Sequence, residues 1–383
     1  MKIMKEYLMS PGPTPIPERV LLAMAEPIIH HRAPKFEKLL EEVRINLKYL
    51  FQTNKEVILH ASSGTGAMEA AVVNTLSSGD KVLTVRGGKF GERWSEIATA
   101  YGAQPIHLDV TWGEAVKPEQ IEDALKKDKD IKAVFIQASE TSTGAEHPVK
   151  DIADIVKKRD DTILIVDAIS ALGVVNLPVD SWGLDVVVAG SQKGLMLPPG
   201  LSFVSVSDKA WGFVKKSNLP KYYFNFSKEE KNLLKNQTAY TPAISLIVGL
   251  KEALNIIKEI GLENLFSRFS TMGDAVRKSA VAMGLGLFAP TSPSNSITAI
   301  KAPEGVDGQA IVKTLRQKYG ITIAGGQSEL KGKIFRIAHM GYVDRFDIIL
   351  TLAALEMTLT ELGFNVELGK GVRVAEEILK KLD

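Results

Sequence analysis

Two stretches, TILIVDA at 162–168 and VVVAGSQK at 186–193, decide the fold of this chain. Each is a short run of branched apolar residues that ends in polar ones, Asp167 in the first and Ser191 in the second. Runs that are apolar throughout, instead of alternating, are typical of strands that helices cover on both faces. The two stretches therefore predict neighbouring strands of a mostly parallel sheet in an α/β protein.

The same pattern continues on both sides of these two strands. Further apolar runs are expected to be strands: VILHA (57–61), KVLTV (81–85), IHLDV (106–110), AVFIQA (133–138) and LSFVSV (201–206). Helical periodicity fills the segments between strands, at 66–77, 91–101, 118–127 and 149–158. Strands and helices that alternate in this way predict one seven-stranded, mostly parallel sheet with right-handed crossovers.

The length of 383 residues favours two domains over one. Residues 1–16 are rich in proline and are expected to form an extended N-terminal arm. Residues 17–255 are expected to form the large domain. Residues 256–383, in which short strand candidates lie among helices, are expected to form a smaller C-terminal α+β domain. The boundary falls inside a long helical stretch at about 243–283.

Composition excludes several classes of function. The 47 basic and 45 acidic residues leave a net charge of +2 without long blocks of one sign, so we expect no nucleic-acid or membrane partner. The absence of cysteine removes disulfides, thiolate metal ligands and a cysteine nucleophile. The six histidines show no metal-binding spacing, and we expect no metal. Because the chain shows neither a signal-like N-terminal segment nor an apolar run of about 18 residues, we expect a cytoplasmic protein.

Polar residues stand at the carboxyl ends of the predicted strands, the edge at which ligands bind in open α/β sheets. Ser63-Gly64-Thr65 follows the strand at 57–61 and opens a helix, whose first N–H groups and dipole suit a phosphate. An ordinary Ser/Thr helix cap would have the same sequence. Lys193 follows the strand at 186–190, where a lysine is costly unless it is exposed, paired or covalently used.

Asp167 and Lys193 end neighbouring predicted strands. An aspartate at this place can simply cap a turn. A desolvated lysine amine, however, is what the formation of a Schiff base with a carbonyl compound requires. Enzymes that use pyridoxal 5′-phosphate (PLP) need such a lysine and an acid that faces the pyridine nitrogen. Together with the phosphate-suited loop, the pair predicts that Lys193 holds PLP as a Schiff base.

The chain resembles the class V aminotransferases, which belong to fold type I of the PLP-dependent transferases. Within this family it is most similar to the alanine–glyoxylate and serine–pyruvate group, including sequences called soluble hydrogenase small subunit. The resemblance covers nearly the whole chain and is carried by PGPTPIP, SSGTGAMEAA, GGKFGERW, ETSTG, VDAISALG, GSQKGLMLPPG, YTPAISL and GKIFRIAHMG. It implies that Lys193 is the catalytic Schiff-base lysine and that Asp167 keeps the pyridine nitrogen protonated.

The resemblance also implies further cofactor contacts. Within one chain these are Ser63, Gly64 and Thr65 at the phosphate, Phe90 stacked on the ring, Thr141 beside the phenolic oxygen, and Gln192. Many relatives have tryptophan in place of Phe90, so we expect weaker stacking here. Gln237 and Thr241 fall where the family reaches the phosphate of the partner subunit, which implies a homodimer with shared active sites.

Three substrate contacts are expected. Arg336 corresponds to the arginine that holds the α-carboxylate of the substrate, for which a planar two-donor fork is suited. Gly12 would bring backbone close to the substrate, although its segment can also be a plain turn. His31 lies in His30-His31-Arg32, and a His-Arg pair in this region also occurs in phosphoserine aminotransferases. In this chain the pair can bind a second acidic group or merely line the entrance.

The implied activity is the ping-pong transfer of an amino group from alanine or serine to a 2-oxo acid such as glyoxylate or pyruvate. Two alternatives within PLP chemistry stay open: a phosphoserine-type aminotransferase and a PLP-dependent lyase that acts on a small amino acid. A third alternative is a non-catalytic subunit of a redox complex. It is disfavoured because no cysteine can ligate an iron–sulfur cluster.

Overall fold

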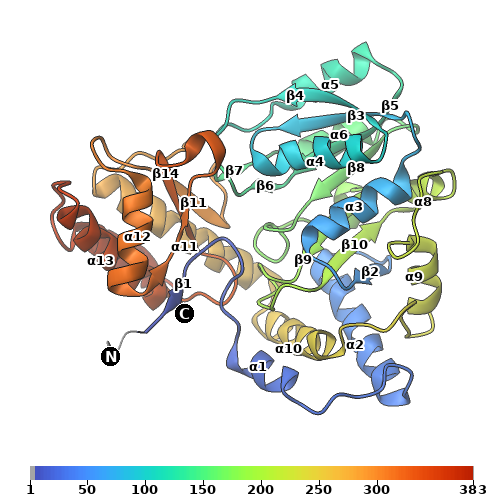
Figure 1. Ribbon diagram of the computed structural model, residues 1–383, viewed down its shortest axis with the longest axis horizontal. Helices are drawn as coiled ribbons and strands as arrows, with labels where there is room; N and C mark the ends of the chain where they lie inside the picture. The colour runs from blue at the N-terminus through green and yellow to red at the C-terminus, as the bar shows by residue number, and fades with distance from the viewer. Residues whose placement is uncertain (1–4, 383) are drawn as a thin grey trace.

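A seven-stranded sheet lies at the centre of the larger part of the chain (Figure 1). The computed structural model describes residues 5–382. The strand order is β2-β10-β9-β8-β5-β3-β4, and β10 alone runs antiparallel to its neighbours β2 and β9. The strands are β2 (Val57–His60), β3 (Lys81–Arg86), β4 (Gln104–Asp109), β5 (Ile131–Gln137), β8 (Ile163–Asp167), β9 (Val186–Gly190) and β10 (Ser202–Val206). The predicted seven-stranded, mostly parallel sheet is confirmed.

The central strands are apolar because both of their faces are covered. Every residue of β8, β9 and β10 is buried, whereas the edge strand β4 has several exposed residues. The expected helices form at α3 (Gly64–Thr75), α4 (Lys89–Ala100), α5 (Pro118–Lys127) and α6 (Val149–Val156). On α4, Trp94 is fully buried and stacks on Phe135 of β5, with ring centroids 4.6 Å apart. This contact anchors α4 on the sheet.

Several short elements in the larger part were not predicted. They are α1 (Glu18–Met24), β6 (Ser139–Glu140), β7 (Ala145–Glu146), α7 (Val179–Trp182), α8 (Asp208–Val214) and α9 (Phe226–Leu233). All are eight residues or shorter, too short for an apolar periodicity to repeat. The longer α2 (Pro34–Phe51) buries one apolar stripe that includes Phe36, Leu40 and Leu47.

The C-terminal part contains a three-stranded antiparallel sheet in the order β11-β14-β13. Its elements are α11 (Leu262–Ala282), β11 (Ile297–Lys301), α12 (Gly308–Tyr319), β12 (Ile321–Thr322), β13 (Ala324–Gly325), the 3₁₀ turn η1 (Ser328–Leu330), β14 (Ile334–Ala338), α13 (Arg345–Glu361) and α14 (Lys370–Leu379). The long helical stretch is two helices, α10 (Ile244–Ile260) and α11. They meet at Gly261, whose φ of 82° is a backbone conformation that favours glycine. The domain boundary at 255 lies within α10 and stays a prediction.

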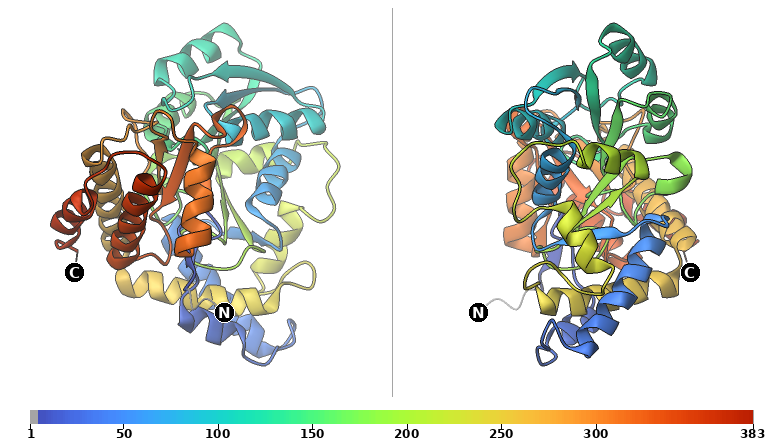
Figure 2. Two further views of the ribbon diagram at one scale, coloured as in Figure 1. Left: turned by 60° about the vertical axis from the view of Figure 1, so that its left-hand side comes forward. Right: turned by 90° about the vertical axis from the view of Figure 1, so that its right-hand side faces the viewer.

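The N-terminal arm lies against the C-terminal part (Figure 1). Strand β1 (Tyr7–Leu8) pairs in parallel with β12, and the carbonyl of the buried Met9 accepts a hydrogen bond from Ala338 N at 2.9 Å. Thr14 then reaches the large part, where Thr14 Oγ1 donates to the carbonyl of Lys193 at 3.0 Å. Figure 2 shows the arm from two further sides. The arm therefore connects the two parts of the molecule.

Candidate active site

Loops at the carboxyl ends of β2, β5, β8 and β9 line one small cavity. Its lining residues are Ser63, Gly64, Thr65, Phe90, Arg93, Ser139, Thr141, Asp167, Ile169, Ser170, Gln192 and Lys193. Every predicted cofactor contact belongs to this set except Gln237 and Thr241. The parallel pairing of β8 with β9 brings Asp167 and Lys193 to the same edge of the sheet, as the two apolar stretches predict.

Asp167 is the last residue of β8 and is 5% exposed. Its Oδ1 accepts a hydrogen bond from Ile169 N at 2.8 Å, which fixes the plane of the carboxyl group. Burial raises the pKa of Asp167 to about 7, and the nearby Glu140 adds to this effect. Lys193 and Arg93 pull the pKa in the opposite direction. A carboxylate in this position is stabilised by any cation that enters the cavity.

Lys193 lies in the loop after β9, and its amine donates to the carbonyl of Pro11 in the N-terminal arm. Burial lowers the pKa of Lys193 to about 8, and Arg336 and Arg93 contribute to the lowering. The carboxylate of Asp167 opposes it. An amine with this pKa is partly neutral near pH 7, as a nucleophile or a general base must be.

Gly12 of the arm packs directly on Lys193. A Cβ atom at Gly12 would lie 2.5 Å from both Cε and Nζ of Lys193. The φ of Gly12 is +121°, a conformation that side chains other than glycine rarely adopt. Gly12 therefore lies next to the amine of Lys193, and its lack of a side chain makes room for that amine. The predicted contact between Gly12 and the substrate stays a prediction.

Ser63 is the N-cap residue of α3, but its side chain accepts no hydrogen bond from the helix. The hydrogen bond of an ordinary Ser/Thr cap is therefore absent, which leaves the hydroxyl of Ser63 open to a ligand. Gly64 and Thr65 follow it as the first residues of the helix. Gln192 also borders the cavity, and its buried Oε1 has no partner among residues 5–382. The free hydroxyl of Ser63 and the first N–H groups of α3 border the cavity and suit an anion, whereas the unpartnered Gln192 Oε1 is an acceptor and suits a hydrogen-bond donor.

Glu140 is a buried carboxylate that holds the start of α4. It accepts hydrogen bonds from Phe90 N at 3.1 Å, Gly91 N at 3.0 Å and Ser142 N at 3.1 Å. Burial raises the pKa of Glu140, although these hydrogen bonds oppose the shift. Glu140 therefore fixes the position of Phe90, whose ring borders the cavity.

Arg336 on β14 is 4% exposed and reaches the same region from the C-terminal part. Its Nη1 donates to the carbonyl of Thr141 at 2.7 Å, and its Nη2 donates to the carbonyl of Gly325 at 2.6 Å. Burial lowers the pKa of Arg336 to about 10. A guanidinium has five N–H donors, so two remain for a substrate after these bonds and the one from Nε to Gly325 at 3.1 Å.

Gly12 and Arg336 contact residues of the cavity without belonging to its lining, and three further predicted residues lie elsewhere in the single chain. Gln237 Oε1 accepts from Arg32 Nη1 at 2.9 Å, and Gln237 Nε2 donates to Glu37 Oε1 at 2.8 Å. His31 stacks on its neighbour His30, and Thr241 is exposed. The expected roles of Gln237 and Thr241 need a partner subunit and stay predictions, as does the expected role of His31.

Four residues that line the cavity were not predicted: Arg93, Ser139, Ile169 and Ser170. Ile169 and Ser170 follow Asp167 by two and three residues, so their nearness to a strand end was a usable signal. Arg93 lies three residues after Phe90 on α4, a spacing that places both on one face of a helix. Ser139 hydrogen-bonds Ser294 and Ser296, with Oγ–Oγ distances of 2.6 Å and 3.0 Å, and these contacts across the chain left no pattern in the sequence.

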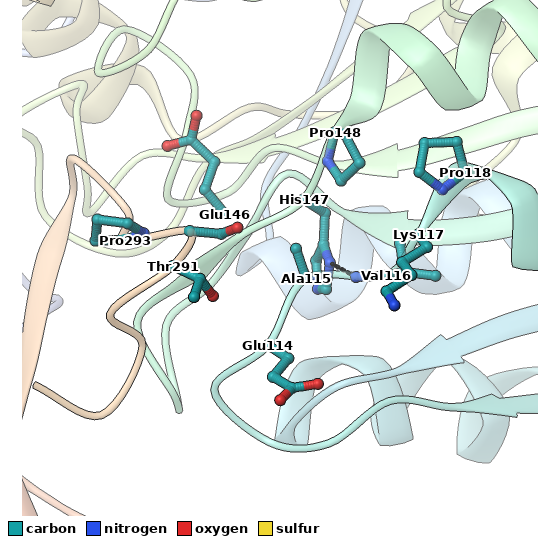
Figure 3. Close-up of a pocket in the computed structure, with 11 residues that line it drawn as sticks. Glu114, Ala115, Val116, Lys117, Pro118, Glu146, His147, Pro148, Thr291 and Pro293 are labelled. Atoms are coloured by element: carbon teal, nitrogen blue, oxygen red, sulfur yellow. Dashed lines mark hydrogen bonds between the residues drawn. The ribbon is translucent and has the colours of Figure 1, made fainter.

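A larger hollow lies elsewhere, between residues 114–118, 146–148 and 291–293 (Figure 3). There His147 Nδ1 accepts from Val116 N at 3.1 Å, and burial lowers the pKa of His147 to about 4, so its ring is neutral. Figure 3 shows the carboxylate of Glu146 pointing away from His147. We assign the chemistry to the cavity at Lys193, because the buried Asp167 and Lys193 come together there from the ends of neighbouring strands. Within residues 5–382, no group of three or more acidic or histidine side chains could hold a metal, and no helix is long and apolar enough to span a bilayer.

Comparison with known proteins gives consistent matches over the whole chain. Residues 6–345 match the family described as Aminotransferase class-V. A soluble hydrogenase small subunit from Synechococcus sp. is 44% identical over 379 residues, with 98% of each chain covered. A serine–glyoxylate aminotransferase from Methylorubrum extorquens is 37% identical, covering 98% of this chain and 96% of its own. The crystal structure of a ureidoglycine–glyoxylate aminotransferase from Bacillus subtilis has a TM-score of 0.94 at 30% identity and covers 99% of both chains.

Proposed function

Because this chain belongs to the class V aminotransferases, a family of PLP-dependent enzymes of fold type I, we propose that it moves an amino group from alanine or serine to glyoxylate or pyruvate. One observation carries the proposal. Asp167 and Lys193 line one cavity from neighbouring strands, and the start of α3 borders the same cavity. Glyoxylate is proposed as the amino acceptor because the names of two similar aminotransferases include it.

The residues of the cavity fit PLP group by group. The buried Asp167 suits a protonated pyridine nitrogen, and the amine of Lys193 suits the aldehyde. Ser63 and the first N–H groups of α3 suit the phosphate, and the unpartnered Gln192 Oε1 is available to a hydrogen-bond donor of the ligand. Phe90 offers an aromatic face. When bound, PLP supplies an electron sink that stabilises negative charge at the substrate Cα.

The chain itself contributes binding and proton transfer. Lys193 would hold the cofactor through Nζ, and once released, the same amine would take the proton from the substrate Cα and deliver it to the C4′ carbon of the cofactor. Its pKa of about 8 lets it serve as both base and acid near neutral pH. Arg336 would hold the substrate carboxylate with its two remaining donors, because a planar fork matches a planar carboxylate. The same groups serve both half-reactions of a ping-pong cycle.

The assembly is proposed to be a homodimer. Thr241 is exposed and is therefore available to a partner subunit, whereas Gln237, which lies outside the cavity of its own chain, would have to exchange its hydrogen bonds with Arg32 and Glu37 for a contact with the partner. In such a dimer each chain would complete the phosphate site of the other. A cytoplasmic location remains the expectation from the sequence.

A half-reaction screen tests the activity and its substrates. The PLP-loaded enzyme is mixed with single amino acids, and the absorbance of the bound cofactor at about 420 nm is followed. Alanine or serine should remove this band and release a 2-oxo acid, and glyoxylate should restore it. Absence of any change with alanine and serine would contradict the proposed donors.

Two controls separate the competing activities. Release of ammonia and pyruvate from serine without an acceptor would instead identify a lyase. The variant Lys193→Ala should keep its fold but lose turnover, because no other amine borders Asp167 in the cavity. Substantial transaminase activity in this variant would refute the assigned mechanism.

A further inference from the structure

Two cationic side chains line the cavity, Lys193 and Arg93. The mechanism above uses the first and leaves the second without a role. Arg93 lies on α4, one turn after Phe90, and is only partly exposed. A guanidinium at a site mouth is a strong and permanent positive charge, so its position needs an explanation.

Two contacts hold the guanidinium of Arg93 at one end of the cavity. Its Cζ lies 4.9 Å from the centre of the Phe90 ring, which is a cation–π distance. Its Nη1 donates to Thr65 Oγ1 at 3.2 Å. Thr65 belongs to the first turn of α3, so Arg93 connects the ring that borders the cavity with the helix start that suits a phosphate.

The charge of Arg93 has no carboxylate partner. Among residues 5–382, no carboxylate oxygen lies within 4.0 Å of its guanidinium, and Thr65 is the one acceptor that it bonds. By contrast, Arg86 at the end of the nearby β3 pairs with Asp109, with Nη2 2.6 Å from Oδ1. Four of the five N–H donors of Arg93 are therefore free for a ligand. The charge also acts across the cavity, because it lowers the pKa of Lys193.

We propose that Arg93 binds the phosphate of PLP together with Ser63, Thr65 and the N-terminus of α3. A phosphate dianion would match the unpaired guanidinium in charge and in its two-donor geometry. The hydroxyl of Thr65 would lie between the helix N–H groups and Arg93, as one shared anion site. This inference rests on PLP as the cofactor and adds a cationic contact to the phosphate-binding loop.

Binding of PLP and of pyridoxal, which lacks the phosphate, tests the role of Arg93. Both compounds carry the same aldehyde, so the contribution of Lys193 cancels when their dissociation constants are compared. In Arg93→Gln, we expect the dissociation constant for PLP to rise about 10- to 100-fold, the range for a lost hydrogen bond to a charged group. The constant for pyridoxal should not change. Arg93→Lys keeps the positive charge but loses the planar two-donor geometry of the guanidinium. Its dissociation constant for PLP should lie between those of the wild type and of Arg93→Gln.

Arg86→Gln serves as the matched control, because it removes a guanidinium that lies outside the cavity and should leave both constants unchanged. Equal weakening of PLP and pyridoxal in Arg93→Gln would overturn the proposal, since it would mean that Arg93 only positions Phe90. Unchanged PLP binding would overturn it as well. If Arg93→Gln does not fold, Arg93→Lys gives the same comparison. If wild-type apoenzyme fails to bind PLP, the assigned function itself is wrong.

Discussion

Replacing Asp167 by asparagine should make the amine of Lys193 reactive at lower pH in the apoenzyme. Burial lowers the pKa of Lys193 from 10.5 to about 8, and the Asp167 carboxylate opposes the lowering. Asparagine keeps the shape of the side chain and removes the charge. The protonated amine then loses its favourable partner, so the pKa falls below about 8.

The size of the effect follows from the fraction of neutral amine. At pH 7 an amine with a pKa of 8 is neutral in about 9% of molecules, against about 0.03% for a pKa of 10.5, so the neutral fraction of Lys193 should exceed that of an ordinary lysine roughly 300-fold. A further drop of one unit, equal to about 1.4 kcal/mol, would raise the neutral fraction at pH 7 to about 50%.

Acylation of the apoenzyme across a series of pH values measures this titration. The peptide that contains Lys193 is quantified by mass spectrometry, and the peptide that contains the exposed Lys301 is the internal control for the reagent. We expect a midpoint near 8 for the wild type and a lower one for Asp167→Asn. A wild-type midpoint near 10.5 would refute the argument from burial. A midpoint that stays the same or rises in Asp167→Asn would show that the two side chains do not interact.

Three further substitutions test other contacts. Gly12→Ala should weaken PLP attachment, seen as a smaller cofactor absorbance, because alanine strains a backbone with a φ of +121° and its Cβ would displace the end of the Lys193 side chain; a normal PLP spectrum would contradict this. Arg336→Lys should raise the KM for the amino donor about tenfold or more with a smaller change in kcat, since the two-donor fork is lost; an unchanged KM would remove Arg336 from the substrate site. Glu140→Ala should lower the free energy of unfolding by at least about 1–3 kcal/mol in denaturant titrations, because the N–H groups of Phe90 and Gly91 lose their acceptor; unaltered stability would contradict this.

Residues at strand ends could be predicted from the sequence, whereas residues brought in by packing could not. The fully apolar runs locate β8 and β9, and parallel strands must bring their carboxyl ends to one edge, so Asp167 and Lys193 follow by a geometric rule. This rule does not apply to Arg93, because Arg93 lies one turn inside a helix and not at the end of a strand. Its nearness to Thr65 depends on how α4 packs on the sheet, through the stacking of Trp94 on Phe135.

The N-terminal arm shows why the rest of the site depends on contacts that are distant in sequence. A proline-rich segment predicts extended backbone, but not what that backbone touches. In the structure Met9 accepts from Ala338, two residues after Arg336, and Pro11 accepts from Lys193. The arm therefore fixes the expected carboxylate-binding arginine relative to the amine that must reach the substrate Cα. Since the chemistry needs those two groups at a set separation, the arm is part of the catalytic geometry and not only a connection between the two parts.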